Sequence, residues 1–286
     1  MRLLLLLRYF SLLLLSIRCI SHEAQMDLKP SSSISAEMKK ACISAFYEKD
    51  PALDNAKYQG HSRLLKPMQA KTEVTPYKPQ QFILKNLQSG PISAMSLTTI
   101  NDHFKLYEAS VASFNALRRF LSESHEPALS EQQLQDVNGR LAYEYAVIVL
   151  HELFFMNTNP NATEPSDKLK SFVEEHYGKS IQALQSDIIE LGQNDGGIGW
   201  ITLLLNYDTE ELLLGFLNGN DISAIATLHP LLVIDMWEHG FIRDFGITGR
   251  KEYLTNYVRH IDWKMVQKRL DGGLKIIKKK KQKSEA

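Results

Sequence analysis

The sequence predicts an α+β protein in which a long helical hairpin precedes a domain built on a three-stranded antiparallel sheet flanked by helices. Three observations predict this class. Apolar residues recur at three- and four-residue steps through two long segments between Ser93 and Met156. Three apolar runs of strand length follow between residues 196 and 237, separated by turn residues. Helical spacing then returns, and strands grouped between helical segments favour α+β over an alternating α/β order.

Residues 1–24 are expected to be a secretory signal peptide. Basic residues flank a leucine-rich opening, the apolar stretch 9–17 is too short to span a bilayer, and Ser21 or Ala24 offers a small-residue cleavage point. The expected location is therefore secreted or periplasmic. An uncleaved N-terminal anchor is the alternative, because Arg8 interrupts the apolar run.

Residues 25–78 mix serine, proline, lysine and other polar residues and are expected to form an extension or linker. The chain has two cysteines. Cys19 leaves with the signal peptide, so Cys42 is then alone and no intrachain disulfide is expected. The apolar core must stabilise the fold.

Residues 79–160 are expected to form the helical-hairpin domain. Its second helix covers about Ser130 to Met156 and contains no proline and only Gly139 as glycine. The segment NTNPNATEPSD, residues 157–167, marks a loop and the domain boundary. The inward stripe of the first helix comprises Ile100, His103, Phe104, Tyr107, Val111, Phe114 and Leu117.

Residues 161–274 are expected to form the α+β domain. A helix at about Ser180 to Leu191 leads into the strand candidates GGIGWITLLLNY, ELLLGFLNG and HPLLVIDMW. The run YLTNYVRHIDWKMVQKRL then predicts one further helix.

The charge of the chain is unevenly distributed. The 33 basic and 33 acidic residues cancel, but removing residues 1–24 (three Arg, one Glu) and 275–286 (six Lys, one Glu) leaves 24 basic against 31 acidic residues, or −7. The basic tail Lys275–Lys283 is therefore a possible contact for an anionic surface, with no specific nucleic acid expected. A solvated, disordered terminus is the alternative.

The polar residues that end the third strand candidate suggest a metal site. Asp235 and His239 lie where the strand is expected to pass into a loop, which lets both side chains turn toward one point. His103 and His151 lie on apolar helix faces, so the four residues make a set of three histidines and one carboxylate, suited to a metal that keeps one position open. The alternatives are a buried Asp–His hydrogen bond and histidines with ordinary core roles.

The segments GGIGWITLL and HPLLVIDMWEHGF, with Arg250, Tyr253, Trp263 and Arg269, resemble the C-terminal domain of the iron/manganese superoxide dismutases, whose strand-end motif is Asp-x-Trp-Glu-His. The similarity extends over roughly residues 80–270. It implies Asp235, His239 and His151 as metal ligands, with Phe155 as the aromatic residue four positions after His151.

The first helix resembles the family's first helix less closely. With Asn115 placed at the family's Asn, counting back without a gap puts Asp102 at the ligand position and His103 one residue late. One residue is about 100° of helix rotation. Loss of a one-residue π-bulge would bring His103 into place, and His103 is therefore predicted as the fourth ligand.

Several residues around this predicted site depart from the family pattern. Such residues orient ligands and tune the bound solvent, so their loss is expected to lower or retune activity more than metal binding. Ser110 lies at the position of the family's active-site Tyr, and Leu106 lies where the family often has a His. Ile242 replaces a further Tyr of the family. The family's solvent-binding Gln has no clear equivalent among Val147, Gly219 and Asn220, of which Asn220 is the nearest amide.

The resemblance implies a superoxide dismutase with one iron or manganese ion per subunit and superoxide as its substrate. Trp200 and Trp237 would wall the site, and Glu238 would reach the ligand histidine of a second subunit in a homodimer. The alternatives are a non-catalytic metal-binding or structural relative, and a surface-binding module that acts through its basic tail.

Overall fold

The computed structural model describes residues 74–123, 128–162, 164–194, 197–222 and 228–284. The expected signal peptide and the extension as far as residue 73 lie outside the described residues. All the described residues belong to one compact unit. Among the described helices, none combines the length and the apolar character needed to cross a bilayer.

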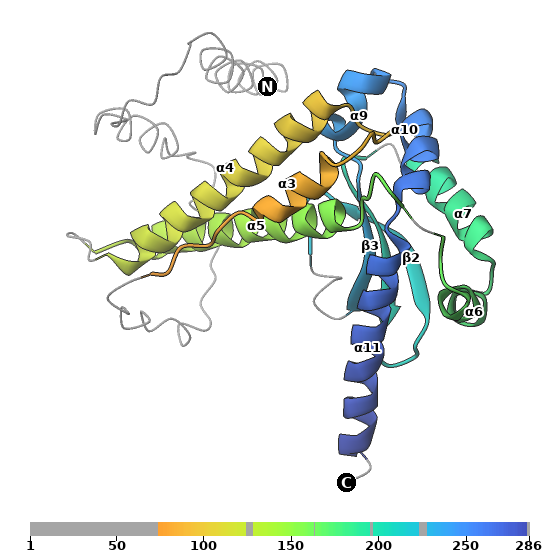
Figure 1. Ribbon diagram of the computed structural model, residues 1–286. Coiled ribbons are helices and arrows are strands. Elements are labelled where there is room, and N and C mark those ends of the chain that lie inside the picture. Colours follow the sequence, from red (N-terminus) through yellow and green to blue (C-terminus); the bar gives the residue numbers. More distant parts are fainter. Residues whose placement is uncertain (1–73, 124–127, 163, 195–196, 223–227, 285–286) are drawn as a thin grey trace, which may run out of the picture. The chain divides into compact units, whose positions relative to one another are not determined.

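Two long helices form the predicted hairpin. Helix α4 covers Leu97–Ser122 and helix α5 covers Glu131–Met156, and they run side by side in opposite directions (Figure 1). The side chain of Ser96 caps α4, and Ser130 forms a capping box with Gln133 at the start of α5. These caps explain why both helices begin where they do.

A segment from the predicted extension packs against this hairpin. Asn115 of α4 accepts a hydrogen bond from the Tyr77 backbone N–H (2.7 Å) and donates one to the Tyr77 carbonyl oxygen (2.8 Å). The Tyr77 hydroxyl donates to Glu152 of α5 at 2.8 Å. A short helix that the sequence did not predict, α3 at Gln81–Leu87, follows and buries Ile83 and Leu87.

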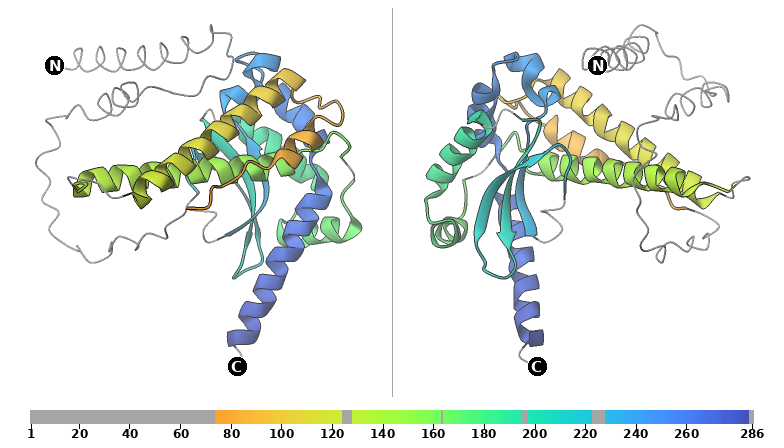
Figure 2. Two further views of the ribbon diagram at one scale, coloured as in Figure 1. Left: turned by 60° about the vertical axis from the view of Figure 1, so that its left-hand side comes forward. Right: turned by 180° about the vertical axis from the view of Figure 1, so that it is seen from behind.

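The sheet confirms the strand prediction. Strands β1 (Gly199–Asn206), β2 (Leu212–Asn218) and β3 (Leu228–Asp235) are antiparallel in the order β2-β1-β3, so the central strand is the first in sequence. Trp200 pairs with Asp235 in the β1–β3 register, which places the carboxylate beside the indole at one end of the sheet. Figure 2 shows the three strands side by side in its right-hand view.

Two helices precede the sheet. Helix α7, Ile181–Asn194, agrees with the helix predicted around Ser180. Helix α6, Asp167–His176, follows the predicted loop directly and was not predicted from the sequence. The Ser166 side chain accepts the Leu169 amide and begins α6 directly after that loop.

The single C-terminal helix predicted from Tyr253 to Leu270 is wrong in detail. Helix α10 covers Arg250–Tyr257, a 3₁₀ turn covers Val258–His260, and helix α11 covers Trp263–Ser284. The break at Ile261 is extended because the Asp262 amide donates to the Asn157 carbonyl at 2.7 Å. This hydrogen bond links the break to the residue that ends α5, and α11 therefore begins in a new direction.

The alternative of a disordered terminus is also corrected. Helix α11 continues through the lysine-rich residues to Ser284. Ile277, within that run, is buried against the rest of the fold, so one apolar residue per two turns keeps the segment helical.

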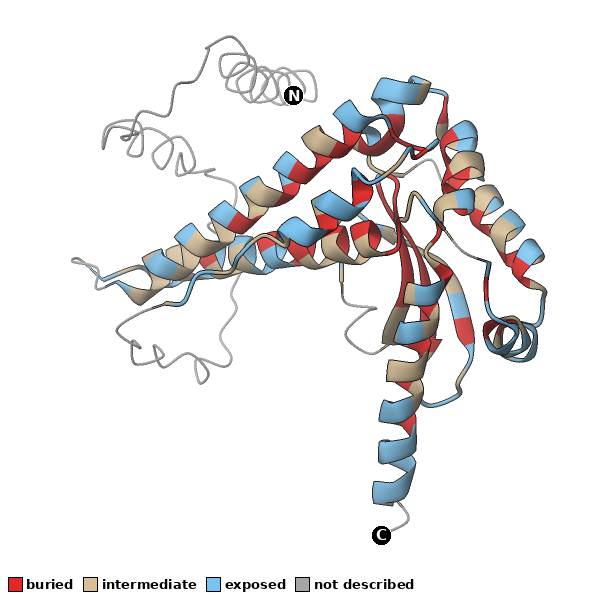
Figure 3. Ribbon diagram, in the orientation of Figure 1, coloured by how far each residue is buried: buried red, intermediate tan, exposed pale blue. Residues whose placement is uncertain are grey.

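The core connects the hairpin with the sheet. Buried residues line the facing sides of α4, α5 and the strands, as the red segments of Figure 3 show. Phe104, Phe154, Trp200 and Tyr257 belong to the same apolar cluster. The hairpin and the sheet therefore hold the side chains between them in fixed positions.

Candidate metal centre

Four side chains from four elements meet where the hairpin reaches the end of the sheet. His103 comes from α4, His151 from α5, Asp235 from the end of β3, and His239 from α9 (Glu238–Phe245). The expectation that β3 passes into a loop was wrong: after Met236 and Trp237 the chain enters α9, and His239 lies in its first turn.

The ligand atoms of these residues surround one carboxylate oxygen. Asp235 Oδ2 lies 3.0 Å from His103 Nε2, 3.4 Å from His239 Nε2 and 3.9 Å from His151 Nε2. All four ligand atoms lie within 4.8 Å of one another. We call these four residues the ligand ring.

The ligand ring fits a transition-metal ion. Two ligands bound at about 2.1 Å lie about 3.0 Å apart at a right angle and about 4.2 Å apart when opposite, and the three distances to Asp235 Oδ2 fall in this range. The Nε2 atoms of His151 and His239 are buried and have no hydrogen-bond partner in the described part of the chain. A bound cation would satisfy both nitrogens and the carboxylate together.

Backbone groups orient two members of the ring. His151 Nδ1 lies 2.8 Å from the Val147 carbonyl oxygen, one helical turn earlier. Because a carbonyl can only accept, Nδ1 carries the proton and the Nε2 lone pair faces the ring. Asp235 Oδ1 accepts the Trp237 backbone N–H at 2.7 Å, which leaves Oδ2 for the ring.

The ring is electrostatically coupled. Burial lowers the pKa of His151 to about 3 and also lowers the pKa of His103. Burial opposes the charged forms of Asp235 and His239 as well, yet their mutual attraction prevails, so the pKa of Asp235 falls and that of His239 rises. Among the three histidines, His239 is thus the one whose charged form is favoured by Asp235.

The structure distinguishes the two candidates on the first helix. His103 points into the ring and is 1% exposed. The Asp102 side chain points outward, pairs with Arg243 at 2.8 Å and is 43% exposed. Helix α4 is α-helical throughout, with no π turn, which is the geometry required for His103 to take the ligand position.

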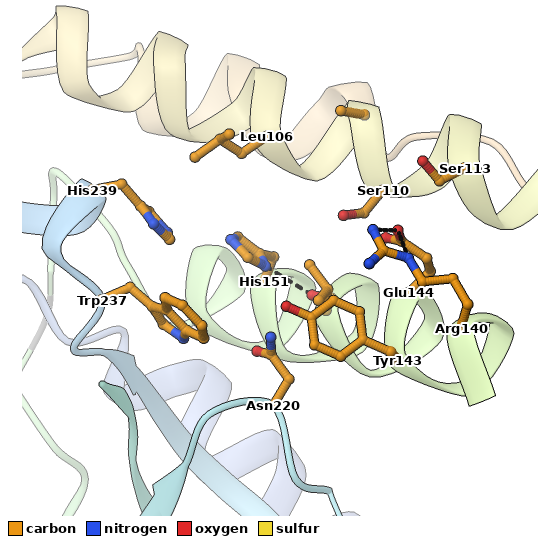
Figure 4. A pocket seen from close by; sticks show the side chains of 12 residues that line it. Leu106, Ser110, Ser113, Arg140, Tyr143, Glu144, His151, Asn220, Trp237 and His239 are labelled. Atoms are coloured by element: carbon orange, nitrogen blue, oxygen red, sulfur yellow. Dashed lines mark hydrogen bonds and ion pairs between the residues drawn. The ribbon is translucent and has the colours of Figure 1, made fainter. Parts of the chain in front are cut away.

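A cavity of about 300 Å³ opens onto His151 and His239. Figure 4 shows α4 on one side of it, α5 on another, and Trp237 and Asn220 closing a third. Its walls carry both hydrogen-bonding and apolar side chains. Besides the two histidines, its lining comprises Leu106, Ala109, Ser110, Ser113, Arg140, Tyr143, Glu144, Val147, Asn220 and Trp237.

Four of the residues singled out as departures from the family pattern lie in this lining: Leu106, Ser110, Val147 and Asn220. Ile242 is exposed on α9 and does not line the cavity. Asn220 Oδ1 accepts the Trp200 indole N–H at 3.0 Å. Since the oxygen is engaged, the Asn220 amide presents its Nδ2 donor to the cavity (Figure 4).

Aromatic rings surround the ligand histidines. Ring centroids lie 5.1 Å apart for Trp200 and His151, 5.1 Å for Phe155 and His103, and 6.0 Å for Trp237 and His239. Trp200 and Phe155 are fully buried. Trp200 and Phe155 thus place buried apolar surface against the ligand histidines, and Trp237 also lines the cavity.

The sequence interpretation missed one polar pair in the cavity wall. Glu144 is 2% exposed, and its Oε1 accepts the Arg140 Nε–H at 2.8 Å. The i, i+4 spacing of Arg140 and Glu144 was a visible signal for an ion pair. The burial of Glu144 could not be predicted, because the apolar pattern of α5 alone does not show that other elements cover the side of α5 that faces the cavity.

Comparisons with known proteins agree with the geometry. Residues 165–269 match the family model described as iron/manganese superoxide dismutases, C-terminal domain. The chain is 28% identical over 172 residues to a superoxide dismutase [Fe] of Methanothermobacter thermautotrophicus, covering 59% of this chain and 82% of that protein.

Two further relatives differ in their metal. A superoxide dismutase [Fe] of Aquifex pyrophilus is 25% identical over 197 residues, which cover 66% of this chain and 91% of the relative. A mitochondrial superoxide dismutase [Mn] of Glossina morsitans morsitans is 26% identical over 152 residues, covering 53% of this chain and 69% of the relative. The chain is therefore similar both to proteins named for iron and to a protein named for manganese.

Proposed function

Because the chain belongs to the iron/manganese superoxide dismutase family as a distant homologue, we propose that it disproportionates superoxide to dioxygen and hydrogen peroxide at one iron or manganese ion per subunit. The observation that carries this proposal is the ligand ring of three histidines and one carboxylate, whose ligand atoms lie within 4.8 Å of one another and of which three members are buried.

His103, His151, Asp235 and His239 would hold the ion. When bound, the ion supplies a redox centre that alternates between the +3 and +2 states, so that one superoxide is oxidised and the next is reduced. Asp235 offsets part of the positive charge, and the carbonyl of Val147 keeps the His151 lone pair directed inward. This rigid geometry means that little reorganisation accompanies a change of charge.

The cavity would admit superoxide and protons. Asn220 Nδ2 and the Ser110 hydroxyl are hydrogen-bond donors on its walls, suited to binding the anion and to holding water that passes protons inward. Trp200, Trp237 and Phe155 limit water to this side. Asn220 thus serves as the amide that positions solvent beside the ligand ring.

A homodimer is part of the proposal. Glu238 lies in the first turn of α9, is exposed, and forms no hydrogen bond or ion pair with the described residues. It adjoins His239 in sequence, so a second copy packed over α9 would bring Glu238 close to the partner's ligand ring. The exposed side chain of Ile242 lies on the same helix.

Export of the protein is proposed on the sequence of residues 1–24, with a secreted or periplasmic destination. N-terminal sequencing of the protein recovered from its native source tests this point. A chain that begins near residue 22 or 25 supports cleavage, and an intact Met1 overturns it.

The activity is tested on purified protein by elemental analysis and by superoxide consumption, beside the variants Asp235→Ala and His239→Ala. The proposal expects about one iron or manganese per chain, superoxide consumption by the wild type, and loss of both in the variants. A wild type that binds metal without consuming superoxide would instead be a non-catalytic metal-binding relative. Equal behaviour of all three proteins would defeat the enzyme proposal.

A further inference from the structure

Helix α11 carries a line of lysines on its outer side. With 100° per residue, six exposed lysines fall on one side of the helix and the buried Val266, Leu270 and Ile277 fall on the other. The line extends over about 28 Å, from 19 residue steps of about 1.5 Å. We call this set the lysine stripe: Lys264, Lys268, Lys275, Lys278, Lys279 and Lys283.

Two other lysines of α11 are neutralised within the fold. Viewed along the helix axis, Lys280 and Lys281 lie on either side of the buried Ile277, and their side chains reach the turn between β1 and β2. Lys280 pairs with Asp208, and Lys281 Nζ lies 2.6 Å from Glu210 Oε1. These four side chains fasten the end of α11 to the sheet, and they set Lys280 and Lys281 apart from the lysine stripe.

The charge of the lysine stripe stays largely uncompensated. Asp271 is the acid on the same side, and its Oδ1 is taken by Lys168 at 2.6 Å. Lys278, Lys279 and Lys283 form no ion pair with any residue that the structure describes. A row of like charges held along one helix costs electrostatic free energy, and a bound polyanion would relieve that cost.

The helix that carries the stripe is held rigidly. A Cβ on Gly273 would meet Leu205 Cδ2 at 2.8 Å, so only glycine permits this close packing of α11 on the sheet. His229 Nε2 donates to the Arg269 carbonyl at 2.9 Å, and Arg269 Nη1 donates to Asn157 Oδ1 at 2.6 Å. The lysines are therefore pre-arranged, which lowers the entropic cost of binding.

We propose that the lysine stripe binds a linear acidic polysaccharide, one that carries sulfate or carboxylate groups along its length. Lysines four residues apart, such as Lys275, Lys279 and Lys283, repeat every 6 Å or so along the helix, which suits successive charges of an extended chain. Lysine acts as a point charge and does not require the planar geometry of one particular anion.

Features of the stripe disfavour other polyanions. It contains no arginine and no aromatic ring, the groups that grip phosphate in pairs and stack on bases. Beside the stripe, Ile276 is the one large apolar side chain of α11 that is exposed among the described residues, and a single side chain does not form an apolar face that could enter a bilayer. Residues 25–274 carry a net charge of −7, and a planar anionic membrane would face that charge, whereas a narrow chain along α11 meets mainly the stripe.

The test measures binding of the full-length protein to heparin by titration at several salt concentrations. If each lysine releases about 0.7 counterions, as on a single-stranded nucleic acid, the six lysines predict a slope of log affinity against log salt of about −4. The double variant Lys278→Gln/Lys279→Gln removes two stripe charges. Lys280→Gln/Lys281→Gln is the matched control, with the same loss of charge on adjacent residues.

The proposal expects the stripe variant to weaken heparin binding about tenfold and to make the slope shallower by about 1.4, while the control stays within about twofold of the wild type. Equal losses of heparin affinity in both variants would mean that net charge alone determines binding, and would overturn the proposal that the lysine stripe is the binding site. Tighter binding of duplex DNA or of phosphatidylserine vesicles at the same salt would overturn the polysaccharide. Metal content and superoxide consumption are expected to be unchanged, so this test is separate from the enzyme proposal.

Discussion

The ligand ring and the cavity beside it differ in how closely they follow the family pattern. The ring keeps three histidines and one aspartate, all directed to one point. The cavity wall has Leu106, Ser110 and Val147 at positions where the resemblance leads us to expect other side chains. The two regions are in contact, yet only the cavity wall departs from what the resemblance leads us to expect.

This difference indicates that holding the ion and tuning its reactivity are separate demands on the sequence. The ring is built from regular elements whose packing fixes each ligand, so a replacement there leaves a buried charge or nitrogen without a partner. The wall faces a space of about 300 Å³, where a replacement can be filled by water. We therefore expect metal affinity to respond to the ring and turnover to respond to the wall.

The largest effect is expected from the ring itself. His103→Ala removes a buried ligand and is predicted to lower metal affinity by at least about 100-fold, more than the loss of an outer hydrogen bond would. Asp102→Ala is the matched control, because that side chain lies one residue away and points to solvent. Metal titration of both apoproteins measures the effect. Equal affinities for the two variants would remove His103 from the ring.

A smaller effect is expected from the wall. Asn220→Ala should retain the ion and reduce superoxide consumption per bound metal by about 10- to 100-fold, because the donor facing the cavity is lost. Asn220→Asp keeps the oxygen that accepts from Trp200 but removes the amide donor, and it should behave like the alanine variant. If both variants match the wild type per bound ion, Asn220 has no part in turnover.

Acid should destabilise the apoprotein through the ring. The pKa of His151 is about 3 in the folded chain and about 6.5 when unfolded, so below pH 6.5 only the unfolded chain takes up this proton. The free energy of unfolding should fall by about 1.4 kcal/mol per pH unit between pH 6.5 and 4. His103, whose pKa is also lowered, adds to the same slope.

The raised pKa of His239 acts in another window, since its stabilising effect is complete below pH 6.5 and is lost above it. Urea unfolding of the apoprotein at pH 6.5, 5.5 and 4.5 measures the predicted slope. His151→Gln should flatten it. A variant with the wild-type slope would show that His151 is not the buried base responsible.

The smallest effect is expected at the proposed subunit contact. Glu238→Gln keeps the shape of the exposed side chain and removes its charge, and it should weaken self-association by a few-fold, about 1 kcal/mol. Sedimentation velocity over a range of protein concentrations measures this, with Glu252→Gln on α10 as a control of equal charge change. A wild type that is monomeric at every concentration would contradict the dimer.

The sequence predicted the fold wherever apolar patterns were long. The capped hairpin and the three strands follow from runs of seven residues or more. Helices α3, α6 and α9 were missed because each has ten residues or fewer, and packing rather than periodicity stabilises helices of that length.

The residues of the site could be predicted from the sequence, but the directions in which single side chains point could not. Asp235 and His239 stand together in the sequence, and β3 and α9 bring them together in space. His103 and Asp102 differ by one step of rotation, which only the packing of α4 against α5 decides. Glu144 is buried because elements distant in the sequence pack around the cavity, and no local sequence pattern predicts that packing.

The most direct test of the central claim is the decay of superoxide measured by stopped flow and normalised to bound metal. We predict that the purified protein holds about one iron or manganese per chain and accelerates the decay, whereas Asp235→Ala holds none and leaves the decay at its spontaneous rate. A wild type that carries its full complement of metal and leaves the decay unaccelerated would contradict the claim that this ligand ring is a dismutase centre.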